Sequence, residues 1–177
     1  MEIWDYIRQN PVQGAKALMN GYRGRLFKTA FRLCSNAATA EDLTARTIVK
    51  AVRCIDQFDE TVSFFGWLCA ILVNFHRMDI RKKGTNALTF MDELPEMVDE
   101  SPNPADVLDA KTDAAAIRTA VERLSPALRE AVILRYFDEL PEAEIAKALE
   151  TTVGAVKVRL HAARRKLKEM LAANLLR

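Results

Sequence analysis

Apolar residues recur with the period of an α-helix along most of the chain. The clearest stripe is formed by Phe64, Trp67, Leu68, Ile71 and Leu72, spaced at i, i+3, i+4, i+7 and i+8. This spacing puts all five side chains on one helix face, where they can form a core. The same period predicts three helices in the first half of the chain, over residues 11–33, about 40–56 and about 64–83.

Short polar segments separate these helices. Residues 35–38 interrupt the pattern, and Thr39 then provides a capping residue with Glu41 and Asp42 in the first turn behind it, so we expect the second helix to start there. A polar loop over residues 59–63 follows Phe58 and leads into the third helix.

The second half of the chain predicts four more helices. One covers residues 115–124, and Ser125-Pro126 begins another that runs to Phe137. Residues 141–168 then predict two helices joined by a tight turn, with Thr151 or Thr152 as the cap of the second. The apolar residues expected to face one another across that turn are Ile145, Ala146, Leu149, Val156 and Leu160. The sequence therefore predicts an all-α protein.

The last predicted helix has a basic face. Its members are Lys157, Arg159, His161, Arg164 and Arg165. Such a face suits a DNA major groove, where base edges and phosphates accept hydrogen bonds. The alternative is an ordinary amphipathic pair with a solvated basic face.

The charge distribution divides the chain into three parts. Residues 1–83 hold 13 Lys and Arg against 8 Asp and Glu, and residues 112–177 hold 12 against 9. Between them, residues 84–111 hold one Lys against seven acids, together with Pro95, Pro102 and Pro104. This pattern predicts two small helical domains, 1–83 and 112–177, joined by a flexible acidic linker over 84–111.

Several classes of protein are excluded by what the sequence lacks. It has no nucleotide-binding loop, no catalytic Ser or Cys constellation and only two histidines, so we expect no enzyme, cofactor or metal. Cys34, Cys54 and Cys69 have no metal or disulfide spacing and are interpreted as free thiols. No signal peptide or membrane-spanning segment is recognisable, which predicts a cytoplasmic location.

Two long blocks resemble the extracytoplasmic-function (ECF) sigma factors of bacterial RNA polymerase. The first is AEDLTARTIVKAVRCIDQFD followed by FFGWLCAILVNFHRMDIRKKG. The second is LSPALREAVILRYFDELPEAEIAKALETTVGAVKVRLHAARRKLKEML. Their order and the acidic segment between them are those of the family, with region 2 first and region 4 second.

The resemblance implies partners and roles for matching positions. The partners are core RNA polymerase (its β′ clamp helices and β flap), promoter DNA and an anti-sigma factor. In the family, region 2 captures a base flipped out of the −10 element, and region 4 reads the −35 element.

Matching core-binding positions are Asp42, Arg46, Lys50 and Arg53, which from the pattern alone would be a solvated face. Matching −10 positions are Phe58, Asp59, Glu60, Thr61, Val62, Ser63, Asn74, Arg77 and Arg81, with Lys82 and Lys83 as further phosphate contacts. Matching −35 positions are Arg135, Lys157, Val158, Arg159, His161 and Arg164.

Some positions depart from the family pattern. Ala45-Arg46 replaces a usual Gln-Glu pair, and Pro141 replaces a usual Ser cap. Glu150 stands where the turn commonly has Gly, which suggests a strained backbone there. Two other functions stay open: a stand-alone helix-turn-helix regulator, and a sigma-like decoy that sequesters an anti-sigma factor.

Overall fold

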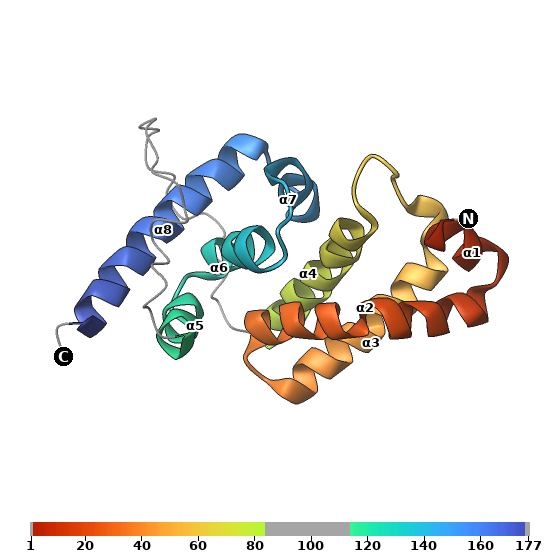
Figure 1. Ribbon diagram of the computed structural model, residues 1–177, viewed down its shortest axis with the longest axis horizontal. Coiled ribbons are helices and arrows are strands. Elements are labelled where there is room, and N and C mark those ends of the chain that lie inside the picture. The colour runs from red at the N-terminus through yellow and green to blue at the C-terminus, as the bar shows by residue number, and fades with distance from the viewer. Residues whose placement is uncertain (1, 84–113, 176–177) are drawn as a thin grey trace.

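Helices form two groups that lie side by side (Figure 1). The structure, a computed structural model, describes residues 2–83 and 114–175. Within these residues there are helices and turns and no strands. The first domain consists of α1 (Ile3–Gln9), α2 (Pro11–Cys34), α3 (Ala37–Arg53), the 3-10 turn η1 (Ile55–Gln57) and α4 (Phe64–Lys82). The second consists of α5 (Ala114–Glu122), α6 (Pro126–Val132), the π-helical turn η3 (Ile133–Phe137), α7 (Glu142–Ala148) and α8 (Val153–Leu175).

The all-α, two-domain prediction is confirmed, and most predicted helices are present. The predicted acidic linker, residues 84–111, lies outside the described residues. Helix α2 is continuous through Gly21 and Gly24. Helix α3 starts earlier than predicted because Asn36, not Thr39, is its cap: the Asn36 Oδ1 atom accepts the Thr39 backbone N–H at 2.9 Å. The prediction of Thr39 as the cap is therefore wrong.

The helix α1 was not predicted, because its seven residues are too few for a periodic pattern. It is held by tertiary contacts: the Trp4 ring lies 5.1 Å from the Phe58 ring and 6.0 Å from the Phe64 ring, centroid to centroid. Ile7 is fully buried against Gly14 of α2. A Cβ atom at Gly14 would lie 2.8 Å from Ile7 Cγ1 and 2.9 Å from Ile7 Cα. Glycine thus allows the two helices to approach this closely.

We expect Gly14→Ala to lower the free energy of unfolding by about 1–3 kcal/mol, since α1 must move away from α2. Gly21→Ala is the matched control in the same helix, because its added Cβ would have no atom within 4 Å apart from the adjacent residues and nearby backbone of its own helix. The control should gain up to about 1 kcal/mol from helix propensity alone. Urea unfolding of both variants measures the difference, and an equal gain for both would contradict the close α1–α2 packing.

The second domain contains the predicted helix-turn-helix, formed by α7 and α8. The side chains of Ile145 and Val156 are fully buried between the helices, and Leu160 is nearly so. Thr152 caps α8 as predicted, since its Oγ1 atom accepts the Ala155 N–H at 3.1 Å. These contacts fix the angle at which α8 leaves the domain.

The two domains pack against each other, with α7 alongside α4 (Figure 1). Helix α2 also contacts η3 of the second domain. The Thr29 hydroxyl in α2 lies 2.9 Å from both carboxyl oxygens of Asp138 in the second domain. Arg32 in α2 lies over the Phe137 ring at 4.4 Å. The described arrangement is therefore closed, with polar and aromatic contacts between the domains.

Candidate nucleic-acid and polymerase surfaces

The loop predicted to read the −10 element runs from Phe58 to Ser63 and leads into α4. Asp59, Glu60, Thr61 and Ser63 are exposed, and Val62 is partly buried. The Thr61 N–H donates to Asp59 Oδ1 at 2.9 Å, so the loop has an internal turn. Hydrogen bonds from the Thr61 hydroxyl and N–H, together with the Lys147 ammonium, lower the pKa of Asp59 to about 2. The loop thus has an internal turn, and its Asp59 carboxylate is stabilised in the ionised form.

Phe58 differs from its predicted role as a direct DNA contact. Its side chain is 6% exposed and its ring contacts Trp4, Phe64 and Trp67 at 5.1–5.3 Å between centroids. Stacking on a base would require this aromatic cluster to open. In the structure Phe58 is a core residue at the start of the loop, and its assignment to the −10 element stays a prediction.

The N-terminus of α4 begins at the end of the loop. Ser63 is its cap, with its Oγ atom accepting the Gly66 N–H at 3.1 Å. The same hydroxyl donates to the Glu144 carboxylate of α7 at 2.5 Å. An acidic group from the second domain therefore lies at the positive end of the α4 dipole.

Further along α4, Asn74 and Arg77 face the second domain and Arg81 is exposed. The Asn74 Nδ2 atom donates to Glu150 Oε1 at 3.3 Å. Arg77 is 8% exposed and Glu130 is 1% exposed. The Arg77 guanidinium donates to the two Glu130 carboxylate oxygens at 3.0 and 2.6 Å, and to the Leu149 carbonyl at 3.3 Å.

In this closed arrangement Arg77, which is predicted to hold a DNA phosphate, is buried and not on an open surface. Its guanidinium is already bound to a carboxylate in a buried, bidentate pair, a strong and directional arrangement. A phosphate could take the place of Glu130 only after the domains separate. By contrast, Arg81, Lys82 and Lys83 are exposed and accessible to DNA as the domains stand.

The predicted polymerase-binding face lies on α3. Lys50, Arg53 and Asp42 are exposed, as predicted. Arg46 instead forms two ion pairs within the domain, with Asp42 at 3.0 Å and with Asp79 of α4 at 2.7 Å. The hydrogen bond that Arg46 donates to the Asp79 carboxylate is the main reason that the pKa of Arg46 is raised. Arg46 therefore joins α3 to α4, and Lys50 and Arg53 are the basic side chains that α3 offers to a partner.

The predicted −35 residues lie mainly along α8. Lys157 and His161 are exposed, whereas Val158, Arg159 and Arg164 are partly buried. Arg135 lies in η3 and not on α8, and its Nη1 atom donates to the Leu140 carbonyl at 3.2 Å. The two exposed residues are one helical turn apart and share a face that can enter a groove.

Glu150 follows the C-cap of α7 and has a left-handed backbone conformation, in line with the strain that the sequence suggested. Its φ is 52°. The Thr151 N–H donates to the Ala146 carbonyl at 2.9 Å and the Glu150 N–H to the Lys147 carbonyl at 3.2 Å. These two bonds form a Schellman motif, in which glycine is the usual residue at this position. A glutamate here is therefore strained, yet its carboxylate is also the acceptor for Asn74.

We expect Glu150→Gly to raise the free energy of unfolding by about 0.5–1 kcal/mol, because glycine adopts positive φ without strain. Glu150→Ala is the control, since it also removes the carboxylate but keeps the Cβ atom. Thermal unfolding of the two variants separates the effects: the glycine variant should melt higher than wild type and the alanine variant should not. Equal melting of both would contradict the assigned strain.

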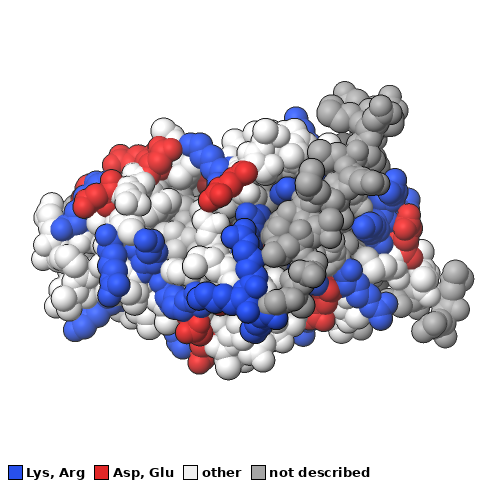
Figure 2. All heavy atoms as spheres, turned by 180° about the vertical axis from the view of Figure 1, so that it is seen from behind, with Lys and Arg blue, Asp and Glu red and all other residues white. Residues whose placement is uncertain are grey.

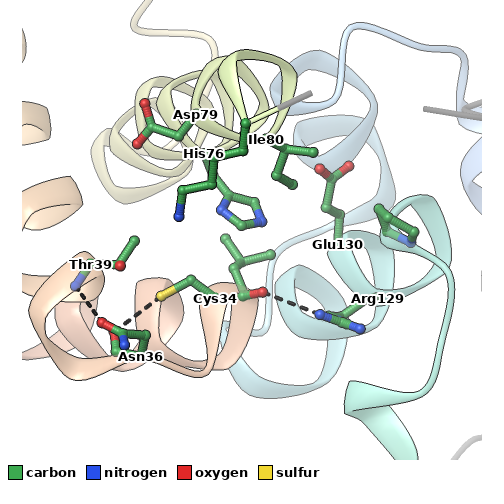
Figure 3. A pocket seen from close by; sticks show the side chains of 11 residues that line it. Cys34, Asn36, Thr39, His76, Asp79, Ile80, Arg129 and Glu130 are labelled. Carbon is green, nitrogen blue, oxygen red and sulfur yellow. Dashed lines mark hydrogen bonds between the residues drawn. The ribbon is translucent and has the colours of Figure 1, made fainter. Parts of the chain in front are cut away.

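A pocket of about 310 Å³ lies between the domains, behind the turn from α2 to α3 (Figure 3). His76 from α4 and Cys34 from α2 both line it, with the Cys34 thiol donating to the Asn36 carbonyl at 3.3 Å. Arg129 enters from α6 and donates to the Leu33 carbonyl at 3.3 Å. Burial is the main cause that lowers the pKa of His76 to about 4, with the positive charge of Arg129 adding to it. Burial likewise raises the pKa of the Cys34 and Cys69 thiols. A neutral imidazole and protonated thiols indicate packing residues and not reactive ones.

Burial also raises the pKa of Asp138 to about 6, against the opposing hydrogen bond from Thr29 and the charges of Arg32 and Arg25. This pKa lies above the ordinary value of 3.8, so Asp138 contributes stability that is present below pH 3.8 and lost as the pH rises through 6. For His76 the sign is reversed: its contribution is present above its ordinary pKa of 6.5 and lost as the pH falls through 4. The two groups therefore oppose each other between about pH 4 and 6.

Sequence reasoning missed the residues of the second domain that bind the predicted −10 surface. They are Glu130, Glu144, Lys147 and Glu150. Only the alternation of acids and a lysine in residues 142–150 hinted at a polar surface. Their partners lie 53 to 88 residues away along the chain, so no local pattern joins them.

Basic side chains gather on part of the surface of the first domain. Figure 2 shows them as a broken band on the face turned away from the view of Figure 1, with acidic side chains at its borders. Within the described residues, no three His, Cys, Asp or Glu side chains lie close enough to hold a metal ion. Nor does any described helix combine the length and apolar character that crossing a membrane requires.

Comparison with known proteins gives matches over both domains. Residues 18–85 match the Sigma-70 region 2 family, and residues 114–167 match Sigma-70 region 4. The chain is 31% identical to the ECF RNA polymerase sigma factor SigE of Mycolicibacterium smegmatis, over 88% of this chain and 60% of SigE. It thus spans less than two thirds of that relative.

Two other matches cover most of this chain and most of the matched protein. The RNA polymerase sigma factor NccH of Alcaligenes xylosoxydans is 31% identical, over 76% of this chain and 74% of NccH. The solved structure of the sigma factor RpoE in complex with the anti-sigma factor NepR, from Bartonella quintana, superposes with a TM-score of 0.67 at 27% identity. It covers 89% of this chain and 96% of RpoE. The chain therefore belongs to the ECF sigma factors of bacterial RNA polymerase.

Proposed function

We propose that the protein is a dissociable specificity subunit that directs core RNA polymerase to promoters and itself catalyses no reaction. The observation that carries this proposal is the presence of both sigma regions in one chain, each with its own exposed basic surface. A stand-alone helix-turn-helix regulator would leave the region 2 match unexplained. We propose the boundaries 1–83 for the region 2 domain, 84–111 for the linker and 112–177 for the region 4 domain.

The first domain would bind both polymerase and the −10 element. Lys50 and Arg53 on α3 are our candidates for the polymerase contact, with Asp42 and Arg46 beside them. The loop from Asp59 to Ser63 and Asn74 would capture a base of the non-template strand that has left the stack. Unstacking costs a few kcal/mol, and the captured base offsets it. Arg81, Lys82 and Lys83 would hold phosphates, which position the strand without specifying its sequence.

The second domain would read the −35 element with α8. Lys157 and His161 are exposed on one face of this helix, so they are the candidates for base contacts, together with Val158. Arg135, Arg159 and Arg164 would contact phosphates. Recognition at the major groove needs only a few such side chains.

We also propose that an anti-sigma factor regulates this protein. RpoE of Bartonella quintana is bound to the anti-sigma factor NepR in its solved structure, and it shares 27% identity with this chain. A subunit of polymerase acts where the polymerase and the chromosome are, so we propose a cytoplasmic location.

Run-off transcription tests the function. Purified core polymerase is incubated with a promoter library, with and without this protein. We expect new start sites that depend on the protein and share two hexamers. A compatible core that gives no new start sites would refute the proposal.

Lys157→Ala should reduce initiation from −35-dependent promoters by about tenfold, since one base contact is worth roughly 1–3 kcal/mol. Lys168→Ala is a matched control, because Lys168 is an exposed lysine three turns further along the same helix. Run-off assays on one selected promoter compare the two. Unchanged promoter strength for the Lys157 variant would remove this residue from the reading set.

A further inference from the structure

Four of the residues assigned to −10 reading are already bound by the second domain. The Lys147 ammonium donates to Asp59 Oδ2 at 3.0 Å and to Thr61 Oγ1 at 2.7 Å. The Ser63 hydroxyl is bound to the Glu144 carboxylate, and the Asn74 amide to the Glu150 carboxylate. All three partners belong to α7 or to its C-terminal turn, so one short helix and its turn bind three side chains of the loop and Asn74 of α4.

The carboxylate of Glu144 occupies a position that favours an anion. Its carboxylate lies beside the Ser63 hydroxyl and the first N–H groups of α4, where a helix dipole favours negative charge. Gly66 gives it room, because a Cβ atom at that position would lie only 2.3 Å from Glu144 Oε2. Glu144 therefore stands where a phosphate or a polar base edge of a DNA strand entering the loop would lie.

A buried contact reinforces this arrangement. Arg77 lies one turn after Asn74 on α4. It is paired with Glu130 of α6 and also donates to the Leu149 carbonyl at the end of α7. The second domain thus supplies three carboxylates, from Glu130, Glu144 and Glu150, to groups on the first domain that would otherwise face DNA. While these carboxylates remain in place, the Ser63 hydroxyl, the Asn74 amide and the Arg77 guanidinium are already engaged as hydrogen-bond donors within the protein.

We propose that α7 is an intramolecular cover for the −10 reading loop, and that closure of the two domains and binding of single-stranded DNA are mutually exclusive. In the free protein the cover keeps the loop from binding DNA at random. Separation of the domains releases Glu144, Lys147 and Glu150 together and exposes the loop. The strained Glu150 fits this role, since a glycine there would relieve the backbone but leave Asn74 without its carboxylate.

The proposal rests on the proposed function, because it takes the loop to be a DNA-binding surface. The test compares wild type with the triple variant Glu144→Ala/Lys147→Ala/Glu150→Gly, in which no altered residue belongs to the DNA-reading set. Glu142→Ala is the control: it lies on α7 and makes the same net change of charge as the triple variant, one positive unit. The probe is a 5′-labelled single-stranded DNA of random sequence, with binding followed by fluorescence anisotropy.

We expect the triple variant to bind this DNA about tenfold more tightly than wild type, since three exposed polar contacts no longer compete. The control should bind as wild type does. Small-angle X-ray scattering of the same samples should show a compact wild-type particle and a larger radius of gyration for the triple variant. A wild-type particle that is already extended, or a triple variant that opens without binding DNA more tightly, would overturn the proposal.

Run-off transcription separates this result from a failure of the proposed function. If wild type directs transcription but the triple variant shows no gain in DNA binding, only the cover is wrong. If no transcription occurs while the gain is present, the cover stands and the assigned function fails.

Discussion

Replacing Glu130 with alanine should open the closed arrangement of the two domains. The substitution leaves the Arg77 guanidinium buried without its carboxylate, and breaking a buried ion pair in this way costs about 3–5 kcal/mol. Arg77 can regain water if the domains separate, so we expect separation instead of unfolding of either domain. Scattering should show a larger radius of gyration, while the fluorescence of Trp4 and Trp67 shows that the first domain remains folded.

Two further variants make this result specific. Glu169→Ala removes an exposed glutamate from α8 and should leave the radius of gyration unchanged. The double variant Arg77→Met/Glu130→Met replaces the pair with apolar side chains, which is often neutral, and should close again. A Glu130→Ala protein as compact as wild type would show that the Arg77–Glu130 pair does not hold the domains together.

Asn74→Ala should slow promoter opening by about ten- to a hundredfold and leave the affinity for core polymerase unchanged. The amide would contact a captured base, and one good base contact is worth roughly 1–3 kcal/mol. The same substitution also removes the Asn74–Glu150 contact, which by itself would favour separation of the domains. A loss of opening would therefore arise from the DNA and not from a tighter closure.

Permanganate reactivity of unpaired thymines measures opening, and fluorescence anisotropy measures attachment to core. Met78→Ala is the control, since Met78 is 43% exposed one turn further along α4. If Asn74→Ala weakens opening and core binding equally, the base-capture role assigned to Asn74 is refuted.

The helices and the helix-turn-helix could be predicted because local patterns determine them. The stripe through Leu68 and Leu72 and the pair Val156 and Leu160 are buried as their spacing indicated. The capping residue of α3 was predicted wrongly because both Asn36 and Thr39 are good caps, and the chain uses the earlier one. The positive φ at Glu150 was predictable because the turn itself requires it.

The contacts between the domains could not be predicted, because they join residues far apart in the sequence. Arg77 has the period of an exposed basic residue on α4, and only the position of α6 makes it a buried partner of Glu130. Phe58 follows the same rule: its burial depends on α1, whose Trp4 covers it. Assignments by resemblance thus identify which residues matter, while the three-dimensional arrangement determines which of them are accessible.

The most direct test of the central claim is the affinity of the purified full-length protein for bacterial core RNA polymerase. The account predicts saturable binding at one protein per core enzyme, weakened by the double variant Lys50→Glu/Arg53→Glu on the exposed face of α3. If neither the wild-type protein nor the opened Glu130→Ala variant binds any bacterial core enzyme, the protein is not a polymerase subunit and the account is contradicted.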